Sequence, residues 1–228
     1  MNLKNALLDL LFPPKCPFCG RILEEDEDML CARCQRALPW LTEKAAERKV
    51  EFADGCFSPL AYRDRARDGV RRYKFRRCLS CAQPFASLMA QCVRDHLREE
   101  ADAVTWAPLS RFRRWRRGFD QAELLARALG RELGLPVVPA LRKVRSTVPQ
   151  SSLTDPARRR ANARGAYRLL PGWQGAGMRL LLVDDVVTSG ATLSECAFLL
   201  RQAGAEKVWC VTLAQAGRGK EKEKARKN

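Results

Sequence analysis

The chain has 228 residues, 46% hydrophobic and 30% charged, a composition that predicts a soluble, folded protein rather than a disordered one. Lysine and arginine together number 42 against 26 acidic residues, so the formal net charge is +16. This excess favours anionic partners such as nucleic acid, anionic lipid or phosphorylated small molecules. The single histidine, His96, excludes a Cys2His2 zinc finger and argues against Ser-His-Asp and Cys-His catalytic sites.

The sequence shows no export signal and no membrane span. The longest uncharged run covers residues 78–93 and contains Pro84 and two glutamines, so it is too short and too polar to cross a bilayer. The N-terminal segment carries Lys4 and Asp9 and has no small-residue cleavage site, so we expect no secretory signal. We therefore expect the reducing cytosol, where cysteines indicate metal binding or core packing.

Residues 1–50 are predicted to form an amphipathic helix followed by a metal-binding module. Apolar residues at positions 3, 6, 7, 10 and 11 have helical spacing, and we expect this helix to pack on the protein, with membrane contact as the alternative. The cysteines that follow have the spacing C-x2-C-x11-C-x2-C: Cys16, Cys19, Cys31 and Cys34. Two residues between paired cysteines let both thiolates reach one tetrahedral zinc ion. We predict a closed, structural Zn2+ site rather than four unrelated core cysteines.

Residues 51–217 alternate strand-like and helix-like segments, which predicts an α/β domain with a parallel sheet. The expected strands are residues 50–61 with a break at Gly55, 102–107, 135–138, 180–183 and 208–214. One helix is expected to begin at the capping box Asp120–Glu123 and to end at Gly134. A second should cover 193–203 and end at Gly204. Residues 218–228 are basic with nothing to bury, and we expect a disordered tail.

The remaining cysteines and the histidine are given structural interpretations. Cys78 and Cys81 form a weaker pair in a stretch that could be helical, and we interpret them as core or chance, with redox chemistry as the alternative. Four further cysteines have apolar neighbours and are predicted to be small core residues: Cys56, Cys92, Cys196 and Cys210. His96 has charged neighbours and is expected to be exposed.

The strongest signal is the segment 180–192, LLLVDDVVTSGAT. A predicted buried strand delivers Asp184 and Asp185 at its C-terminal end, which is the edge where ligands bind in doubly wound sheets. The turn after it offers free N–H groups at a helix N-terminus, hydroxyl groups and no bulky side chains, as a phosphate requires. Its residues are Thr188, Ser189, Gly190, Ala191 and Thr192. Carboxylates accept hydrogen bonds from vicinal hydroxyls, so the segment predicts a site for a ribose 5-phosphate.

This segment resembles, at every position, the phosphoribosyl pyrophosphate (PRPP) motif of type I phosphoribosyltransferases. The surrounding motifs are similar to those of the competence protein F (ComF) family over about residues 14–215. They are Cys31-Ala-Arg-Cys34 before Leu38-Pro-Trp40, Arg116-Arg-Gly-Phe-Asp-Gln-Ala122, and Gln150, Leu153, Arg159 and Asn162 before Gly165-Ala-Tyr167. The resemblance implies a phosphoribosyltransferase type I fold, a parallel sheet flanked by helices, with a small N-terminal zinc module. It also implies PRPP bound with Mg2+ and a role in DNA uptake during natural transformation.

The resemblance also implies roles for single residues. Asp184 and Asp185 would contact the ribose hydroxyls, and the turn 188–192 would hold the 5-phosphate. The loop Trp106–Ser110, including Leu109 and Ser110, would hold pyrophosphate, although it departs from the Val-Pro-Val-Pro run usual in the family. The protein would act on the cytoplasmic side of the membrane, with other DNA-uptake proteins or the membrane surface as further partners.

Three basic clusters add a nucleic-acid hypothesis. They are residues 63–77, 111–117 and 158–160. In the second, Phe112 and Trp115 alternate with the arginines Arg111, Arg113, Arg114, Arg116 and Arg117. Guanidinium groups bind phosphates and aromatic rings stack on unpaired bases, so single-stranded DNA is one expected partner. The alternative is that these arginines neutralise pyrophosphate, because the cluster adjoins the expected pyrophosphate loop.

Two functions remain open from the sequence. In the first, the protein is a phosphoribosyltransferase that displaces pyrophosphate at the ribose C1 carbon in favour of an unidentified acceptor. In the second, the protein keeps the fold and its pocket but has no catalytic activity, and it acts in DNA uptake as an accessory protein that binds single-stranded DNA. The sequence identifies neither the acceptor nor the oligomeric state.

Overall fold

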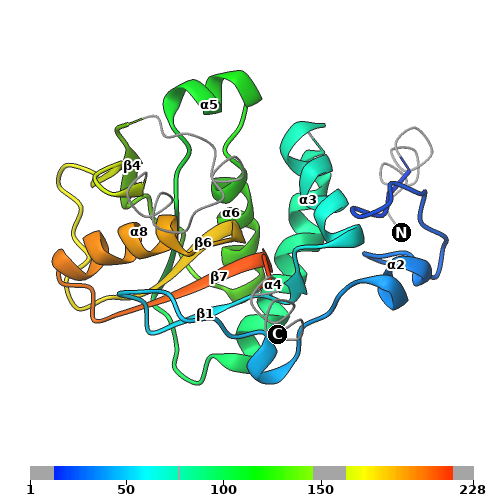
Figure 1. Cartoon of the computed structure of the whole chain (residues 1–228), viewed down its shortest axis with the longest axis horizontal. Coiled ribbons are helices and arrows are strands. Elements are labelled where there is room, and N and C mark those ends of the chain that lie inside the picture. The colour runs from blue at the N-terminus through cyan, green and yellow to red at the C-terminus, as the bar shows by residue number, and fades with distance from the viewer. Residues whose placement is uncertain (1–12, 77, 146–162, 218–228) are drawn as a thin grey trace, which may run out of the picture.

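The computed structural model describes residues 13–76, 78–145 and 163–217 (Figure 1). The predicted N-terminal helix and the basic tail lie outside the described residues, as do Gln150, Leu153, the arginines at 158–160 and Asn162. Within the described part of the chain, no helix combines the length and apolar character needed to cross a membrane.

A parallel sheet forms the centre of the structure. Its strand order is β1 (Gly55–Phe57), β7 (Lys207–Gln215), β6 (Arg179–Val187) and β3 (Ala103–Trp106), and β2 (Leu60–Ala61) also pairs with β7. Each of these pairs is parallel, as the alternation of strands and helices in the sequence predicts. The carboxyl ends of β3 and β6 therefore lie at one edge of the sheet.

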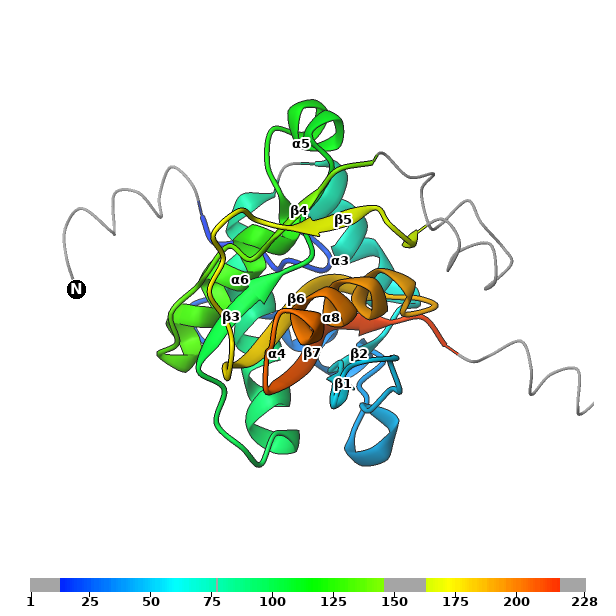
Figure 2. The same ribbon diagram turned by 90° about the vertical axis from the view of Figure 1, so that its left-hand side faces the viewer.

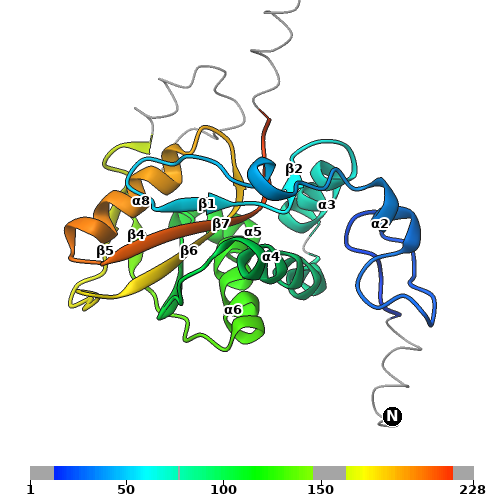
Figure 3. The same cartoon turned by 90° about the horizontal axis from the view of Figure 1, so that it is seen from below.

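Helices cover both faces of the sheet. Since side chains alternate along a strand, Leu181 and Val183 of β6 pack in one core with α4 (Ala82–His96) and α6 (Gln121–Leu133). Leu180 and Leu182 pack in the other core with α8 (Ala191–Gln202). Figures 2 and 3 show α8 on one side of the sheet and α4 and α6 on the other.

Local sequence signals set the helix boundaries. Asp120 caps α6, because its carboxylate accepts hydrogen bonds from the N–H groups of Ala122 and Glu123. Gly134 ends the same helix with φ 69°. Glu123 pairs with Arg114 and Arg127, so only the Asp120 half of the predicted capping box is seen among the described contacts. The second predicted helix, α8, begins at Ala191, two residues before the expected start.

Several strand predictions need correction. The expected strand 135–138 is reduced to a single bridge between Val137 and Val104. The expected strand 50–61 begins only at Gly55, where we predicted a break. The strand predicted to end at Val183 continues to Val187, so both aspartates lie inside β6 near its end. In this long strand Asp184 and Val186 keep pairing with β7.

The N-terminal module shares a core with the α/β domain. It contains α2 (Ala32–Ala37) and the 3-10 helix η1 (Glu43–Ala45), and it packs against α3 (Asp64–Phe75). The Phe18 ring lies 5.1 Å from that of Phe85 in α4. A Cβ atom at Gly69 of α3 would come within 2.5 Å of the same Phe18 ring, so this close approach requires glycine.

A small antiparallel pair stands apart from the main sheet. It consists of β4 (Leu141–Lys143) and β5 (Tyr167–Leu169) and lies near α5 (Arg111–Arg117) in Figure 1. Because α5 and β4 follow β3 in the chain, they bring basic side chains to the sheet edge where β6 delivers its aspartates.

The cysteines outside the module behave in two ways. The four predicted core cysteines are buried, which confirms that prediction. Cys78 and Cys81 are joined by a disulfide at the 3-10 helix η2 (Leu79–Cys81), where we expected core packing or chance. His96 was expected to be exposed but is partly buried, with Nδ1 2.8 Å from the Cys92 carbonyl oxygen and its ring 5.5 Å from that of Phe57.

Candidate functional site

The segment 184–192 forms one wall of a cavity of about 220 Å3 at the carboxyl edge of the sheet. Gly190, the residue that precedes α8, has the left-handed conformation with φ 80°, so the chain can turn from β6 into the helix. A Cβ atom there would lie 3.3 Å from Val50. The predicted ligand residues that line the cavity are Leu109, Asp184, Asp185, Thr188, Gly190, Ala191 and Thr192.

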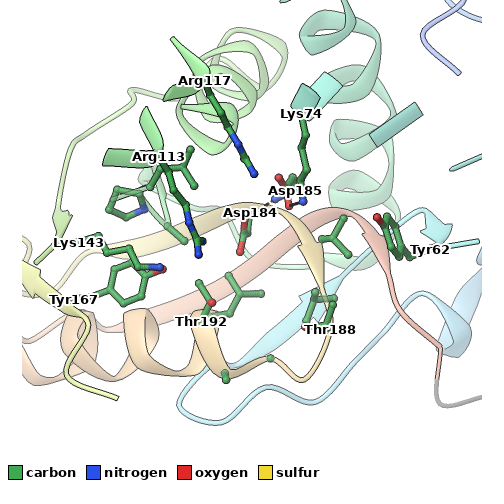
Figure 4. A pocket seen from close by; sticks show the side chains of 18 of the residues that line it. Tyr62, Lys74, Arg113, Arg117, Lys143, Tyr167, Asp184, Asp185, Thr188 and Thr192 are labelled. Carbon is green, nitrogen blue, oxygen red and sulfur yellow. Dashed lines mark hydrogen bonds and ion pairs between the residues drawn. The ribbon is translucent and has the colours of Figure 1, made fainter. Parts of the chain in front are cut away.

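The rest of the cavity wall is mainly basic and aromatic. Figure 4 shows Arg113 and Arg117 reaching in from α5, Lys143 from β4 and Lys74 from α3, around the two aspartates. Tyr62, Phe75 and Tyr167 line the same cavity. An anion that carries several phosphates and a hydroxyl-rich centre would find both cations and carboxylates in the cavity lining.

The two aspartates differ in their surroundings. Lys74 Nζ lies 2.7 Å from the carboxylate of Asp185, and both side chains are largely buried, at 20% and 12% exposure. Asp184 accepts a 2.8 Å hydrogen bond from the backbone N–H of Asp185. Burial, and then the charge of Asp185, raise the pKa of Asp184 to about 7. In the ligand-free cavity the ionised form of Asp184 is therefore unfavourable, and a hydrogen-bond donor or a cation from a ligand would stabilise it.

Lys143 is the most perturbed cation of the cavity. Burial, followed by the nearby charge of Arg113, lowers the pKa of Lys143 to about 8. Its Nζ lies 3.0 Å from the Tyr167 hydroxyl and 4.8 Å from the centre of the Tyr167 ring. The amine is thus held by a neutral partner and remains able to pair with an incoming anion.

Two predicted ligand residues lie outside the cavity lining. Ser110 is buried and caps α5, accepting a hydrogen bond from the N–H of Arg113. Ser189 Oγ accepts a hydrogen bond from the N–H of Ala191 and shapes the turn itself. The structure thus gives both hydroxyls a role in placing neighbouring groups.

The structure divides the arginines of α5 into two sets. Arg113 and Arg117, one helical turn apart, are partly buried and line the cavity. The exposed set is Arg111, Arg114 and Arg116, together with Phe112 and Trp115. Arg113 and Arg117 therefore suit the hypothesis of pyrophosphate binding, and the exposed set suits the hypothesis of single-stranded DNA binding. The two sets lie on opposite faces of one short helix.

Sequence reasoning missed the cavity residues Tyr62, Lys74, Phe75 and Lys143. Lys74 and Phe75 belong to the basic cluster 63–77, whose charge and interleaved aromatics predict nucleic-acid binding and not a place in this cavity. Lys143 had no local signal, because only the antiparallel pairing of β4 with β5 brings it beside Tyr167. Tyr62 follows the short strand β2.

The predicted zinc ligands form a compact cluster. The sulfur atoms of Cys16, Cys19, Cys31 and Cys34 all lie within 4.8 Å of one another. A tetrahedral zinc ion with Zn–S bonds of about 2.3 Å needs sulfurs about 3.8 Å apart, so the cluster fits the ion. Burial opposes ionisation of Cys31, but the N–H of Cys34 and the neighbouring thiols outweigh it and lower the pKa of Cys31 to about 7. The site needs no further ligand, which is typical of structural zinc.

Comparisons with known proteins find relatives of both the N-terminal module and the α/β domain. A family model described as double zinc ribbon domain matches residues 7–48, and one described as phosphoribosyl transferase domain matches residues 116–227. Competence protein F of Haemophilus influenzae is 35% identical over 89% of this chain and 85% of its own. DNA utilization protein YhgH of Escherichia coli K12 is 34% identical over 86% of this chain and 82% of its own.

Similarity to solved structures is weaker. An adenine phosphoribosyltransferase aligns with a TM-score of 0.43 at 14% identity, over 69% of this chain and 80% of that one. The glutamine PRPP amidotransferase of B. subtilis aligns with a TM-score of 0.40 at 25% identity, over 58% of this chain and 26% of that one.

The parallel sheet, the strand–turn–helix at its edge and the matched domain define a protein of the phosphoribosyltransferase type I fold, with a structural zinc site in its N-terminal module. The extent and level of identity then assign the family, and the chain belongs to the competence protein F family.

Proposed function

We propose that this protein binds PRPP with Mg2+ in the cavity and transfers its phosphoribosyl group. The observation that carries the proposal is the arrangement of the cavity, where the turn 188–192 and two aspartates face a set of cations. The N–H groups at the start of α8 and the threonines Thr188 and Thr192 would hold the 5-phosphate. Asp184 and Asp185 would accept hydrogen bonds from the ribose hydroxyls.

The proposed reaction is a substitution at the ribose C1 carbon. The bond from C1 to the pyrophosphate oxygen breaks, and pyrophosphate leaves with the electron pair. A bond forms from C1 to the acceptor, which gives up a proton. Positive charge would develop on the ribose ring in the transition state, and Asp184 and Asp185 would stabilise it if the ribose binds beside them. Arg113, Arg117 and Lys143 would stabilise the negative charge that develops on pyrophosphate.

Magnesium would supply further charge neutralisation on pyrophosphate when it is bound. The cavity offers suitable ligands, because Asp184 and Asp185 present carboxylate oxygens, the donors that Mg2+ prefers. These two residues would hold the ion directly or through water.

Mass action gives the first test of this proposal. PRPP should raise the melting temperature of the zinc-loaded protein when Mg2+ is present. The double variant Asp184→Asn/Asp185→Asn should lose that shift. A full response in the double variant would remove the aspartates from the proposed ribose site. Pyrophosphate release with a panel of bases and nucleic acids then tests turnover, which binding alone does not establish.

A second candidate function rests on the outer face of α5. Phe112 and Trp115 are 60% and 80% exposed there, with ring centres 6.4 Å apart, among exposed arginines. Such a surface suits the stacked bases and phosphates of single-stranded DNA. The names of two relatives, competence protein F and DNA utilization protein YhgH, agree with this candidate. In this proposal the protein works in DNA uptake on the cytoplasmic side of the membrane, alone or with other uptake proteins.

A further inference from the structure

A second basic site lies on the side of α3 that faces the N-terminal module. Figure 1 shows α3 between the module and the sheet. A groove runs between α3 and the module. Four arginines line it, three from α3 and one that directly follows this helix: Arg65, Arg71, Arg72 and Arg76. The groove also contains Phe18 and Cys19 of the module and Asp68. It is separate from the cavity at the sheet edge, although Phe75 lines both.

Three of these arginines are available to an anion. Within the described residues, Arg71, Arg72 and Arg76 form no ion pair, although Asp68 lies in the same groove. Arg65 has another partner, because its Nη1 lies 3.7 Å from the sulfur of Cys34 in the zinc cluster. Unpaired guanidinium groups gathered in one groove repel each other, so a bound phosphate would relieve that repulsion as well as form hydrogen bonds.

Arg72 is held in place before any ligand arrives. Its guanidinium packs over Gly20, where the absence of a Cβ atom leaves room for it. Its Nε is buried and has no hydrogen-bond partner among the described residues. Because this N–H is buried, Arg72 serves the groove through the fixed position of its guanidinium and not through Nε.

Phe75 connects the groove to the proposed PRPP cavity. Its side chain is 65% exposed, and the Arg117 guanidinium lies 5.2 Å from the centre of its ring. An exposed aromatic ring offers a stacking surface to a planar base. A ligand with its base at Phe75 and its phosphate among the arginines would place the base beside the cavity and its anionic group in the groove.

We propose that this groove binds the 5′-phosphate of a nucleotide whose base, held at Phe75 on the cavity wall, is the acceptor of phosphoribosyl transfer. The new bond joins the ribose C1 of PRPP to a base nitrogen that carries a proton, such as N3 of thymine, and that proton is released as pyrophosphate leaves. The nitrogen already bonded to the nucleotide's own sugar takes no part. The inference rests on the proposed function, since it names the class of acceptor. Two kinds of ligand could supply this 5′-phosphate: a free mononucleotide, or the 5′ end of a single strand of DNA. Arg71, Arg72 and Arg76 would bind the phosphate oxygens, and Phe75 would position the base.

Calorimetric titration of the zinc-loaded full chain tests the groove. The probes are thymidine 5′-monophosphate and a six-residue oligothymidylate with or without a 5′-phosphate. The variant is Arg71→Gln/Arg76→Gln, which changes two exposed side chains. We expect it to lose about 10- to 100-fold in affinity for the phosphorylated probes. The charge-matched control Arg67→Gln/Arg98→Gln changes two exposed arginines outside the groove and should lose at most about threefold.

The outcomes separate the two sources and the two proposals. Binding of the mononucleotide supports a free nucleotide, and binding of only the phosphorylated oligomer supports a strand end. Equal losses in both double variants, equal affinity with and without the 5′-phosphate, or no binding by the unaltered protein would overturn the groove site. The PRPP-dependent rise in melting temperature should persist in Arg71→Gln/Arg76→Gln. Its absence from the unaltered protein would contradict the proposed function and leave the nucleotide result standing.

Discussion

Removing the charge of Asp184 should stabilise the ligand-free protein. Asp184→Asn keeps the shape of the side chain and the oxygen that accepts the N–H of Asp185. It removes a buried negative charge whose pKa is raised by burial and by Asp185. The ion pair between Lys74 and Asp185 remains intact in this variant.

The pH dependence follows from the direction of that shift. The pKa of Asp184 is raised from 3.8 to about 7, so between these values the native state binds more protons than the unfolded state. The free energy of unfolding contributed by this group therefore falls as pH rises from about 4 to 7. Asp184→Asn lacks that fall, so its advantage should be absent near pH 4 and complete near pH 8.

The size of the advantage has an upper limit. A shift from 3.8 to about 7 corresponds to at most about 4 kcal/mol. Because Asp184 lines an open cavity, we expect the realised gain to be about 1–3 kcal/mol. For a chain of this size that is a rise of about 2–12 °C in melting temperature.

Thermal and urea unfolding at pH 4.5 and pH 8 measure the effect. Asp185→Asn is the matched variant, and it should be less stable than the unaltered protein because it leaves Lys74 without its partner. An Asp184→Asn protein that is no more stable at pH 8 than the unaltered one, with no trend in pH, would refute the account of this pair.

Four further predictions concern three other sites. Cys31→Ser should lower the zinc content below one ion per chain and destabilise the module. Metal analysis and melting curves measure these two effects. Full zinc content in this variant would contradict the proposed set of four ligands. PRPP affinity should fall up to about tenfold between pH 7 and pH 9, because Lys143 loses its proton over this range. Lys143→Arg should flatten that pH profile in calorimetry. An unchanged profile in this variant would assign the pH dependence to another group. On α5, Trp115→Ala should cost about 1–3 kcal/mol of binding to single-stranded DNA without changing its salt slope. Arg111→Ala/Arg116→Ala should reduce that slope by about 1.4 if both arginines contact phosphates, and an unchanged slope would remove the outer face of α5 from DNA binding.

The features predicted correctly depend on neighbours in the sequence. A buried strand, a turn of small residues and a helix start follow one another within 180–192, so the strand–turn–helix that lines the cavity is predictable from one segment. Asp120 and Gly134 likewise act on the helix between them. The zinc cluster was predicted because ligand spacing within each pair is itself a local constraint.

The features that escaped prediction depend on distant partners. Lys74 and Asp185 meet across more than a hundred residues, and nothing near either residue announces the ion pair. The segment 135–138 has strand-like composition, but it contributes one bridge at the edge beyond β3. His96 lies among charged residues in the sequence, yet folding places it against Phe57 and the carbonyl of Cys92.

The contact of Phe18 with Gly69 and Phe85 makes the zinc module part of the wall that supports α3. The same helix carries Lys74 into the proposed PRPP cavity. A chelator that strips the metal should therefore alter a pocket on the far side of the helix. Zinc and PRPP binding would then be coupled through α3, and exchanging the module for that of another protein would require redesign of this helix.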